Sequence, residues 1–417
     1  MNKNLRAGAS KIVITPPIGF RLSGYEDRIQ GCTGVHDELY ARALVMEDGV
    51  EEAAIVSCDM IGISKELVKE VRREVEKNTG IKGDSVMVAA THTHAGPDLD
   101  FSNGNYIDIL IKEIAGAVKA ASLNLANVRI GAGKGDAIIG YNRRNPQHSF
   151  FLVPYPEGVR DSEVTAFKVI NEKGNLIAAI VNTPCHAVVL GSTNLLISAD
   201  YPGYAMRMLE NTLGGVPMFL NGCCGNINPV HTEGGHTVIN NKVVRGEGLF
   251  YEAERLGNIL GGESLKVLEQ IEETNVENSV RSKRSELSLS IRKDVPKEML
   301  DMLKQIDVSR SRFSLYQNIL DRKDIITEVQ AIAIGDIAVV GVPGEVFIEF
   351  GLEIKKKSPF KYTLVSELAN DIIGYVPVPE DFKEGGYEPT ATIVSQDAGA
   401  KITRAALNLL MDLKESK

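Results

Sequence analysis

The sequence contains no tryptophan, and aromatic residues make up only 6% of its 417 positions. No apolar run reaches the length that a membrane-spanning helix needs, and the first residues lack the apolar core of a secretory signal peptide. The most basic stretch is Arg281-Ser282-Lys283-Arg284, which is short and lies in a segment of alternating, strand-like pattern. Nucleic-acid binding requires a basic stripe or stacking aromatic residues. We therefore expect neither a membrane span nor a nucleic-acid partner.

Cysteine is also scarce: the chain has five, at Cys32, Cys58, Cys185, Cys223 and Cys224. An odd number of cysteines without a secretion signal favours reduced thiols and a cytoplasmic protein. The adjacent pair Cys223-Cys224 would suit a metal or redox site, but no C-x-x-C motif accompanies it. We interpret both as small packing residues.

The chain is otherwise typical of a globular protein, with 43% hydrophobic residues, 24% charged residues and a formal net charge of −9. From about residue 40 onward, strand-like and helix-like patterns alternate; for example, Ala41–Met46 and Ala53–Ser57 predict a hairpin, and Ser64 begins an amphipathic helix. A surface helix is expected at 298–321, and a loop insertion at about 230–247. Such alternation predicts one α/β domain over residues 1–417, with a mixed β-sheet core flanked by helices.

Two histidines follow one of the predicted strands. The apolar run Val86–Ala90 leads into Thr91-His92-Thr93-His94, and Gly96-Pro97 ends the segment. Side chains two positions apart on extended backbone point to the same side, so His92 and His94 are expected to project together. Both could bind zinc, or one could bind the metal while the other transfers protons. The alternative is two partly buried histidines that donate to backbone carbonyl groups.

Polar residues also follow several other apolar runs, at Asp59, His186, Asn226, Asn228 and Glu345. Strands of one sheet that end in such residues can converge on a single cleft. Two histidines and a carboxylate would meet the needs of zinc. Each residue also has a structural alternative: His186 as a core histidine, Glu345 as a carboxylate at a helix start, and Asp59 as a cap or ion-pair partner.

Taken together, these motifs resemble the neutral ceramidase family, the zinc-dependent N-acylsphingosine amidohydrolases. The resemblance rests on motifs that occur in the family's order: Gly34-Val35-His36 with Ala41-Arg42-Ala43, Ala90-Thr91-His92-Thr93-His94-Ala95-Gly96-Pro97, Asn142-Arg143, Pro184-Cys185-His186, Ile197-Ser198-Ala199-Asp200-Tyr201-Pro202-Gly203-Tyr204, Gly225-Asn226-Ile227-Asn228-Pro229, Pro343-Gly344-Glu345, and Gly374-Tyr375 followed by Tyr387-Glu388. They cover most of the chain, and the Thr-His-Thr-His-x-Gly-Pro element is quite specific.

The resemblance implies a fold and a set of site residues. It implies the α/β fold of the family's N-terminal domain, with zinc held by His92, His186, Glu345 and Tyr375. Three further residues match family positions that transfer protons or bind the substrate carbonyl: His94, Arg143 and Tyr387.

The sequence departs from the family in two respects. Asn228 stands where ceramidases have a serine, and because an amide is no nucleophile, attack by metal-activated water is expected instead, with Asn228 holding a water or a substrate oxygen. The C-terminal sandwich-like domain of the ceramidases also has no counterpart here, which argues against ceramide as the substrate.

These observations predict a zinc-dependent hydrolase that cleaves an amide bond, or an ester or lactone bond, of a small polar substrate. Three alternatives stay open: a ceramidase or N-acyl-lipid amidase, another zinc-dependent reaction on a carbohydrate-like substrate, and a non-catalytic metal-binding homologue. The sequence indicates neither the substrate nor the oligomeric state. It also leaves the roles of His231 and His236 open, either as loop residues or as ligands of a second metal.

Overall fold

The computed structural model describes most of the chain. The described residues are 5–25, 28–99, 104–148, 152–230, 236–239, 242–245, 248–272, 279–295, 297 and 322–416. The helix expected at 298–321 and the side chain of His231 lie outside them. None of the described helices combines the length and the apolar character that crossing a bilayer requires.

The largest element of the fold is a mixed sheet of eight strands. In spatial order its strands are β11 (Val216–Asn221), β9 (Leu176–Thr183), β8 (Glu163–Asn171), β6 (Ala126–Asp136), β1 (Arg6–Val13), β3 (Tyr40–Glu47), β4 (Glu52–Cys58) and β5 (Val86–Ala90). The β4–β5 and β9–β11 pairs are parallel and the others antiparallel. The predicted β3–β4 hairpin is confirmed.

Four helices cover one face of this sheet: α1 (Lys65–Thr79), α2 (Gly104–Leu123), α3 (Asp200–Leu213) and α4 (Phe250–Gln270). The start of α1 matches the prediction, because the hydroxyl of Ser64 accepts a hydrogen bond from Leu67 N. Its buried positions are the apolar ones of the sequence pattern: Leu67, Val68, Val71 and Val75. The helix ends at Gly80, whose φ of 85° is the left-handed conformation that glycine favours.

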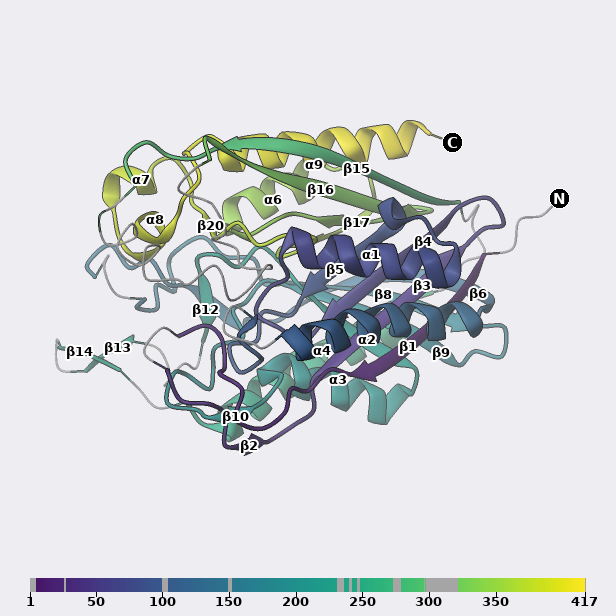
Figure 1. The fold of residues 1–417 in the computed structure, drawn as a ribbon, viewed down its shortest axis with the longest axis horizontal. Coiled ribbons are helices and arrows are strands. Elements are labelled where there is room, and N and C mark those ends of the chain that lie inside the picture. Colours follow the sequence, from purple (N-terminus) through teal and green to yellow (C-terminus); the bar gives the residue numbers. More distant parts are fainter. Residues whose placement is uncertain are drawn as a thin grey trace.

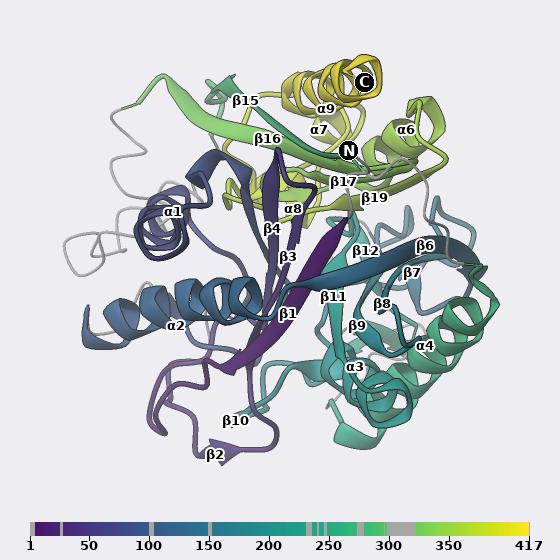
Figure 2. The same ribbon diagram turned by 90° about the vertical axis from the view of Figure 1, so that its right-hand side faces the viewer.

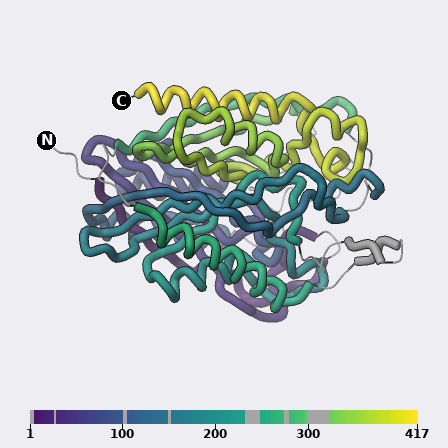
Figure 3. The backbone as a smooth tube through the Cα atoms, turned by 180° about the vertical axis from the view of Figure 1, so that it is seen from behind, coloured from purple at the N-terminus to yellow at the C-terminus, as the bar shows by residue number. Residues whose placement is uncertain are grey.

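A second, four-stranded sheet packs against the other face. It consists of β15 (Val280–Ser290), β16 (Asp324–Ile334), β17 (Ile337–Gly341) and β19 (Tyr362–Ser366), with α6 (Ile348–Lys357) and α9 (Ala398–Glu415) on its outer side. One buried apolar cluster joins the two sheets, with Phe167 and Leu220 from the first and Val339 and Leu364 from the second. The molecule therefore has four layers, helices outside and two sheets inside (Figure 2). From behind, α4 and α9 run along opposite outer sides (Figure 3).

The expected mixed β-sheet core flanked by helices is confirmed, and the structure adds that this core consists of two stacked sheets. An apolar strand pattern shows that a strand is buried, but it does not show which of two stacked sheets the strand joins. The α/β class itself is confirmed.

Short strand pairs join the connecting segments at one end of the layers (Figure 1). They are β2 (Gly34–Val35) with β10 (Leu196–Ile197), β7 (Gly140–Asn142) with β12 (Ile227–Pro229), β18 (Glu345–Val346) with β20 (Tyr375–Val376), and β13 (His236–Ile239) with β14 (Lys242–Arg245). The β13–β14 hairpin corrects the expectation of a simple loop at 230–247. The remaining short helices are η1 (Gly83–Ser85), α7 (Asp381–Glu384) and α8 (Tyr387–Ala391).

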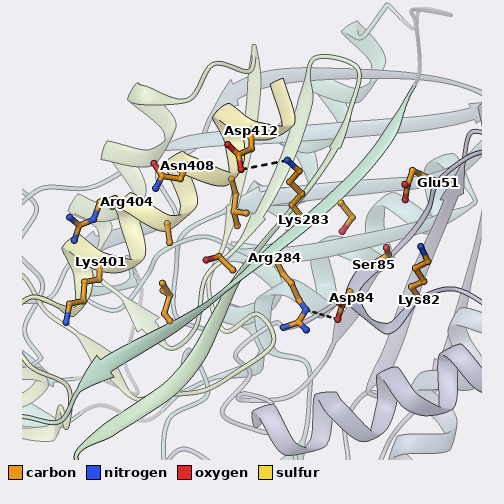
Figure 4. A pocket seen from close by; sticks show the side chains of 15 residues that line it. Glu51, Lys82, Asp84, Ser85, Lys283, Arg284, Lys401, Arg404, Asn408 and Asp412 are labelled. Carbon is orange, nitrogen blue, oxygen red and sulfur yellow. Dashed lines mark hydrogen bonds and ion pairs between the residues drawn. The ribbon is translucent and has the colours of Figure 1, made fainter. Parts of the chain in front are cut away.

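The basic stretch noted in the sequence lies on β15. There Lys283 and Arg284 line a groove of about 760 Å³, together with residues of η1 and α9 (Figure 4). Arg284 Nε lies 2.7 Å from Asp84 Oδ1, and Lys283 Nζ lies 3.7 Å from Asp412 Oδ2. Acidic neighbours thus offset the positive charge of this stretch.

Candidate functional site

The two histidines after β5 lie together, although the backbone is not extended between them. His92 has a φ of 69°, which is left-handed and uncommon for a residue with a side chain. Its ring Nδ1 lies 2.7 Å from the carbonyl oxygen of Ile61. His92 Nε2 lies 3.4 Å from His94 Nε2. The expected proximity is confirmed, but a local turn produces it.

His186 joins them from the segment after β9. Its Nδ1 lies 2.8 Å from the carbonyl oxygen of Cys224 and 3.1 Å from that of Ile227. The ring centroids of His186 and His92 are 4.5 Å apart, and one ring nitrogen from each of His92, His94 and His186 lies within 4.8 Å of the others. His186 is fully buried, as a core histidine would be, but it lies beside the other two histidines.

Glu345 supplies a carboxylate at the centre of this group. Its Oε2 lies 3.1 Å from His186 Nε2 and 3.4 Å from His92 Nε2. The parallel pairing of β18 with β20 places Glu345 directly opposite Tyr375. The Tyr375 ring stacks beside His186 with a centroid distance of 6.5 Å. All four residues that the family resemblance implies as metal ligands are thus neighbours.

The hydrogen bonds of this group leave its lone pairs facing inward. His92 Nδ1 faces a backbone carbonyl oxygen, and His186 Nδ1 faces two backbone carbonyl oxygens and, at 3.3 Å, the sulfur of Cys224. Because a carbonyl oxygen can only accept, each Nδ1 carries a proton, and each ring in its neutral form keeps its lone pair on Nε2. Both lone pairs then face the same Glu345 oxygen, which is also an acceptor. Acceptors that converge in this way need a proton or a cation between them. This donor set fits zinc, whose ligating histidines commonly donate the other ring N–H to a carbonyl group.

The pKa shifts of the cluster have a common cause in burial and charge. Burial disfavours the charged form of His92, but the Glu345 carboxylate outweighs it and raises the pKa of His92. Burial would raise the pKa of Glu345, but His92 and His186 hold that pKa well below its usual value. Burial, then Arg143, lowers the pKa of His186 to about 3. Burial and the two neighbouring histidines hold the pKa of His94 well below its usual value.

Arg143 lies behind this cluster, directly after β7. Its Nε donates to Glu388 Oε1 at 2.7 Å, its Nη1 to Asn228 Oδ1 at 3.0 Å, and its Nη2 to the carbonyl oxygen of Gly225 at 2.8 Å. The guanidinium carbon lies 5.4 Å from the centroid of the Tyr375 ring. The side chain is buried and held rigidly by these contacts.

Tyr387 begins α8 on the outer side of the cluster. Its ring centroid lies 5.6 Å from that of Tyr375, and the residue is 45% exposed. Tyr387 is therefore close to the candidate ligands and accessible to a bound molecule.

Two other polar residues that follow apolar runs have structural roles. Asp59 is buried and its Oδ2 lies 2.7 Å from Arg42 Nη1, which confirms the ion-pair alternative. Asn226 accepts a hydrogen bond from Ile348 N and donates one to Glu349, so it connects its loop to α6.

The sequence reasoning missed two acidic residues, Glu388 and Glu367. Glu388 follows a predicted site residue and binds both Arg143 and Arg144. Glu367 comes directly after β19, so the same strand-end signal that indicated Glu345 could have revealed it.

Glu367 connects two segments that carry candidate ligands. Its Oε2 accepts hydrogen bonds from Cys224 N at 2.9 Å and Val346 N at 3.0 Å. Its Oε1 lies 2.9 Å from Cys224 Sγ, and burial raises the pKa of this carboxyl to about 8. Cys224 thus does more than pack, whereas Cys223 lies in an apolar cluster as expected.

Known proteins share part of this sequence and its fold. The family model described as neutral/alkaline non-lysosomal ceramidase, N-terminal, matches residues 6–222. The chain belongs to this ceramidase family. A neutral ceramidase of Drosophila melanogaster is 26% identical over 253 residues, which cover 54% of this chain and 36% of that protein. A neutral ceramidase of Pseudomonas aeruginosa is 27% identical over 232 residues, which cover 50% of this chain and 34% of that protein. The aligned region thus spans about a third of each of these ceramidases.

The structural comparison covers more of the chain. A crystal structure of neutral ceramidase from Pseudomonas aeruginosa superposes with a TM-score of 0.78 and 19% identity, covering 100% of this chain and 75% of that chain. A second structure, of a ceramidase complexed with C2, gives a TM-score of 0.78 at 18% identity, covering 99% of this chain and 75% of that chain. The ceramidase fold is therefore shared by both halves of this chain.

Proposed function

We propose that this protein is a zinc-dependent hydrolase that cleaves an amide bond, or an ester or lactone bond, of a small polar substrate by metal-activated water. The observation that carries the proposal is the convergence of His92 Nε2 and His186 Nε2 on one oxygen of Glu345. Membership in the ceramidase family supports the same chemistry.

Zinc would be held by His92, His186, Glu345 and Tyr375. When bound, the ion supplies Lewis-acid chemistry, because it polarises a carbonyl oxygen and acidifies water. The carbonyl groups that accept from the Nδ1 atoms of His92 and His186 orient both rings before the ion binds.

In this proposal His94 transfers protons and does not bind the metal. His94 is partly exposed, whereas His92 and His186 are fully buried, and its Nε2 lies 3.4 Å from His92 Nε2. In its neutral form, the His94 ring can accept a proton from water and return it to the leaving nitrogen.

Arg143 and Tyr387 have different roles in this proposal. Arg143 has its Nε and both Nη atoms engaged by Glu388, Asn228 and Gly225, so it orients other groups. Tyr387 is 45% exposed. Its hydroxyl can donate a hydrogen bond to a substrate oxygen.

The relatives supply a second candidate substrate. Several of them bear the name neutral ceramidase, which favours ceramide or another N-acyl lipid. The identity to two of these relatives is only 26% and 27% over the aligned residues, so we retain the small polar amide as the first proposal. We also propose that the protein acts in the cytoplasm.

The test is a hydrolysis assay on the zinc-loaded protein. The substrates are N-acyl derivatives of 7-amino-4-methylcoumarin with acyl chains from acetyl to dodecanoyl, and a fluorescent short-chain ceramide. We expect turnover of the short-chain anilides, and no turnover in the His186→Ala variant purified in the same way. Turnover of ceramide alone would support the lipid amidase instead. Retained turnover in a variant that has lost its zinc would contradict the proposal.

A further inference from the structure

The side-chain amide of Asn228 has a defined orientation. Its Oδ1 accepts a hydrogen bond from Arg143 Nη1 at 3.0 Å. A guanidinium group has donors and no acceptor, so the oxygen of the amide, and not its nitrogen, must face Arg143. Arg143 in turn is fixed by Glu388 and by the carbonyl oxygen of Gly225. The orientation of Asn228 therefore follows from the hydrogen-bond network itself.

This orientation leaves the amide nitrogen of Asn228 as a donor without an acceptor. Among the residues that the structure describes, no group accepts a hydrogen bond from Asn228 Nδ2. Asn226, two positions earlier, differs: its Oδ1 accepts from Ile348 N at 2.9 Å and its Nδ2 donates to Glu349 Oε2 at 3.1 Å. Asn228 is only 4% exposed and its side chain is bonded at Oδ1, so Nδ2 is the end of the side chain that is free to donate to a bound molecule.

Asn228 also lies next to the histidine cluster. The preceding residue, Ile227, accepts hydrogen bonds from the His186 backbone N and from His186 Nδ1, both at 3.1 Å. On its other side, Asn228 shares the Arg143 guanidinium with Tyr375, whose ring lies beside His186. Asn228 is thus next in the chain to a residue whose carbonyl oxygen binds the candidate ligand His186.

Building on the proposed hydrolase function, we propose that Asn228 is a catalytic residue that donates a hydrogen bond from Nδ2 to the carbonyl oxygen of the scissile amide. A side-chain amide N–H can only donate, so it cannot activate the attacking water, but it can stabilise the oxygen on which negative charge develops.

The reaction then proceeds without a covalent enzyme intermediate. The water oxygen bonds to the carbonyl carbon, His94 takes the proton that the water loses, and the C=O π pair moves onto the oxygen that Asn228 binds. When that pair returns, the C–N bond breaks and its electrons leave with the nitrogen. The nitrogen takes the proton from His94, and the products are a carboxylic acid and an amine.

Two variants distinguish the hydrogen bond that Nδ2 of Asn228 would donate to the substrate from the hydrogen bond that its Oδ1 accepts from Arg143. Asn228→Asp keeps an acceptor for Arg143 but replaces the donor with an oxygen, whereas Asn228→Leu removes both. Turnover of N-acetyl and N-hexanoyl 7-amino-4-methylcoumarin is measured, together with thermal unfolding. We expect both variants to lose about 10²–10³-fold in kcat, as removal of one oxyanion donor does elsewhere.

Three outcomes overturn the inference. A decrease in kcat in Asn228→Leu, with near-normal kcat in Asn228→Asp, would mean that Asn228 only supports Arg143. A decrease in kcat in Asn228→Asp alone would mean that the introduced charge, and not the missing donor, is responsible. Intact-mass detection of an acyl adduct on the wild-type chain would replace water attack with a side-chain nucleophile.

A binding measurement keeps this inference separate from the hydrolase proposal. Should the wild-type protein cleave none of the amides, the hydrolase proposal fails, and calorimetric binding of hexylphosphonate, a tetrahedral oxyanion, tests Asn228 alone. We expect binding to the zinc-loaded wild type that weakens at least tenfold in both variants. Absent binding to the wild type, or equal binding to all three proteins, would overturn the inference.

Discussion

At the scale of single residues, backbone carbonyl groups determine the orientation of the two histidine rings among the candidate ligands. The Ile61 carbonyl fixes the ring of His92, and the Cys224 and Ile227 carbonyls fix that of His186. The left-handed φ of His92 is a strained conformation that such contacts must maintain. Chain geometry thus orients both histidines before any ligand is present.

The first prediction concerns Glu367, which connects the Cys224 segment to Val346. Glu367→Gln should bind zinc like the wild type, because a glutamine oxygen can accept from both backbone N–H groups. Glu367→Ala leaves those N–H groups unpaired and should weaken zinc binding about 10–100-fold, as loss of outer hydrogen-bonding partners does at other metal sites. Competition with a chelating dye measures the affinity. Equal affinities in all three proteins would contradict a positioning role for Glu367.

The second prediction concerns the pH dependence of stability and Asp371, a buried carboxyl that is not one of the candidate ligands. Burial raises its pKa to about 6, whereas the unfolded chain has the ordinary value of 3.8. The native state therefore keeps a proton between about pH 4 and 6 that the unfolded state has released, so this contribution to stability is lost as the pH rises through that window. The loss amounts to about 3 kcal/mol at most.

Asp371→Asn tests this directly. Both backbone donors, Lys65 N and Ile372 N, bind Oδ1, and the asparagine oxygen can accept from both. Urea unfolding of the variant should show a smaller decrease in stability between pH 4 and pH 6 than the wild type does. If the free energies of unfolding of the variant and the wild type changed equally with pH, the pKa of Asp371 would not be raised in the folded state.

At the scale of elements, short strand pairs assemble the candidate site. The β18–β20 pair places Glu345 opposite Tyr375, and the β7–β12 pair places Arg143 beside Asn228. The Gly225 loop packs closely on β18, because a Cβ added at Gly225 would lie 2.5 Å from the carbonyl oxygen of Glu345. Glycine is required there for the close approach of two backbones.

The third prediction follows from that contact. Gly225→Ala should displace Glu345 and lower both zinc content and the thermal midpoint. Gly262→Ala is the matched control, because that glycine lies inside α4 with no atom within 4 Å of an added Cβ. Its replacement should leave zinc content unchanged and add about 0.5–1 kcal/mol of stability through helix propensity. Normal zinc content in Gly225→Ala would show that the Gly225 contact does not position Glu345.

At the scale of the whole molecule, the site depends on two stacked sheets. The histidines follow strands of the eight-stranded sheet, whereas Glu345 and Tyr375 lie in segments that connect elements of the second sheet. The apolar layer between the sheets, which includes Leu220 and Val339, therefore determines how the two halves of the site meet (Figure 2).

The fourth prediction tests this layer. Leu220 is fully buried between the sheets, so Leu220→Ala should cost about 2–5 kcal/mol in the free energy of unfolding. Leu123 is 75% exposed, and Leu123→Ala should change stability by less than about 0.5 kcal/mol. Denaturant unfolding measures both. Similar losses in the two variants would contradict the assignment of Leu220 to a packed inter-sheet layer.

The sequence was informative where local patterns determine structure. Ser64 and the apolar spacing after it predicted α1, and the strand before His92 was recognised from its apolar run. The stacking of two sheets could not be predicted, because it depends on contacts between strands far apart in the chain. The position of Glu367 directly after β19 could have been recognised from the sequence, whereas its partners, Cys224 N and Val346 N, could not, because they lie far from it in the chain.

The central claim is that His92, His186, Glu345 and Tyr375 hold one zinc ion. Elemental analysis of the purified chain after zinc loading and desalting tests it most directly, with His186→Ala as the matched variant and circular dichroism as the check on folding. We expect about one zinc ion per wild-type chain and none in the folded variant. A wild-type chain that retains no zinc, or a folded His186→Ala variant that retains as much as the wild type, would contradict it.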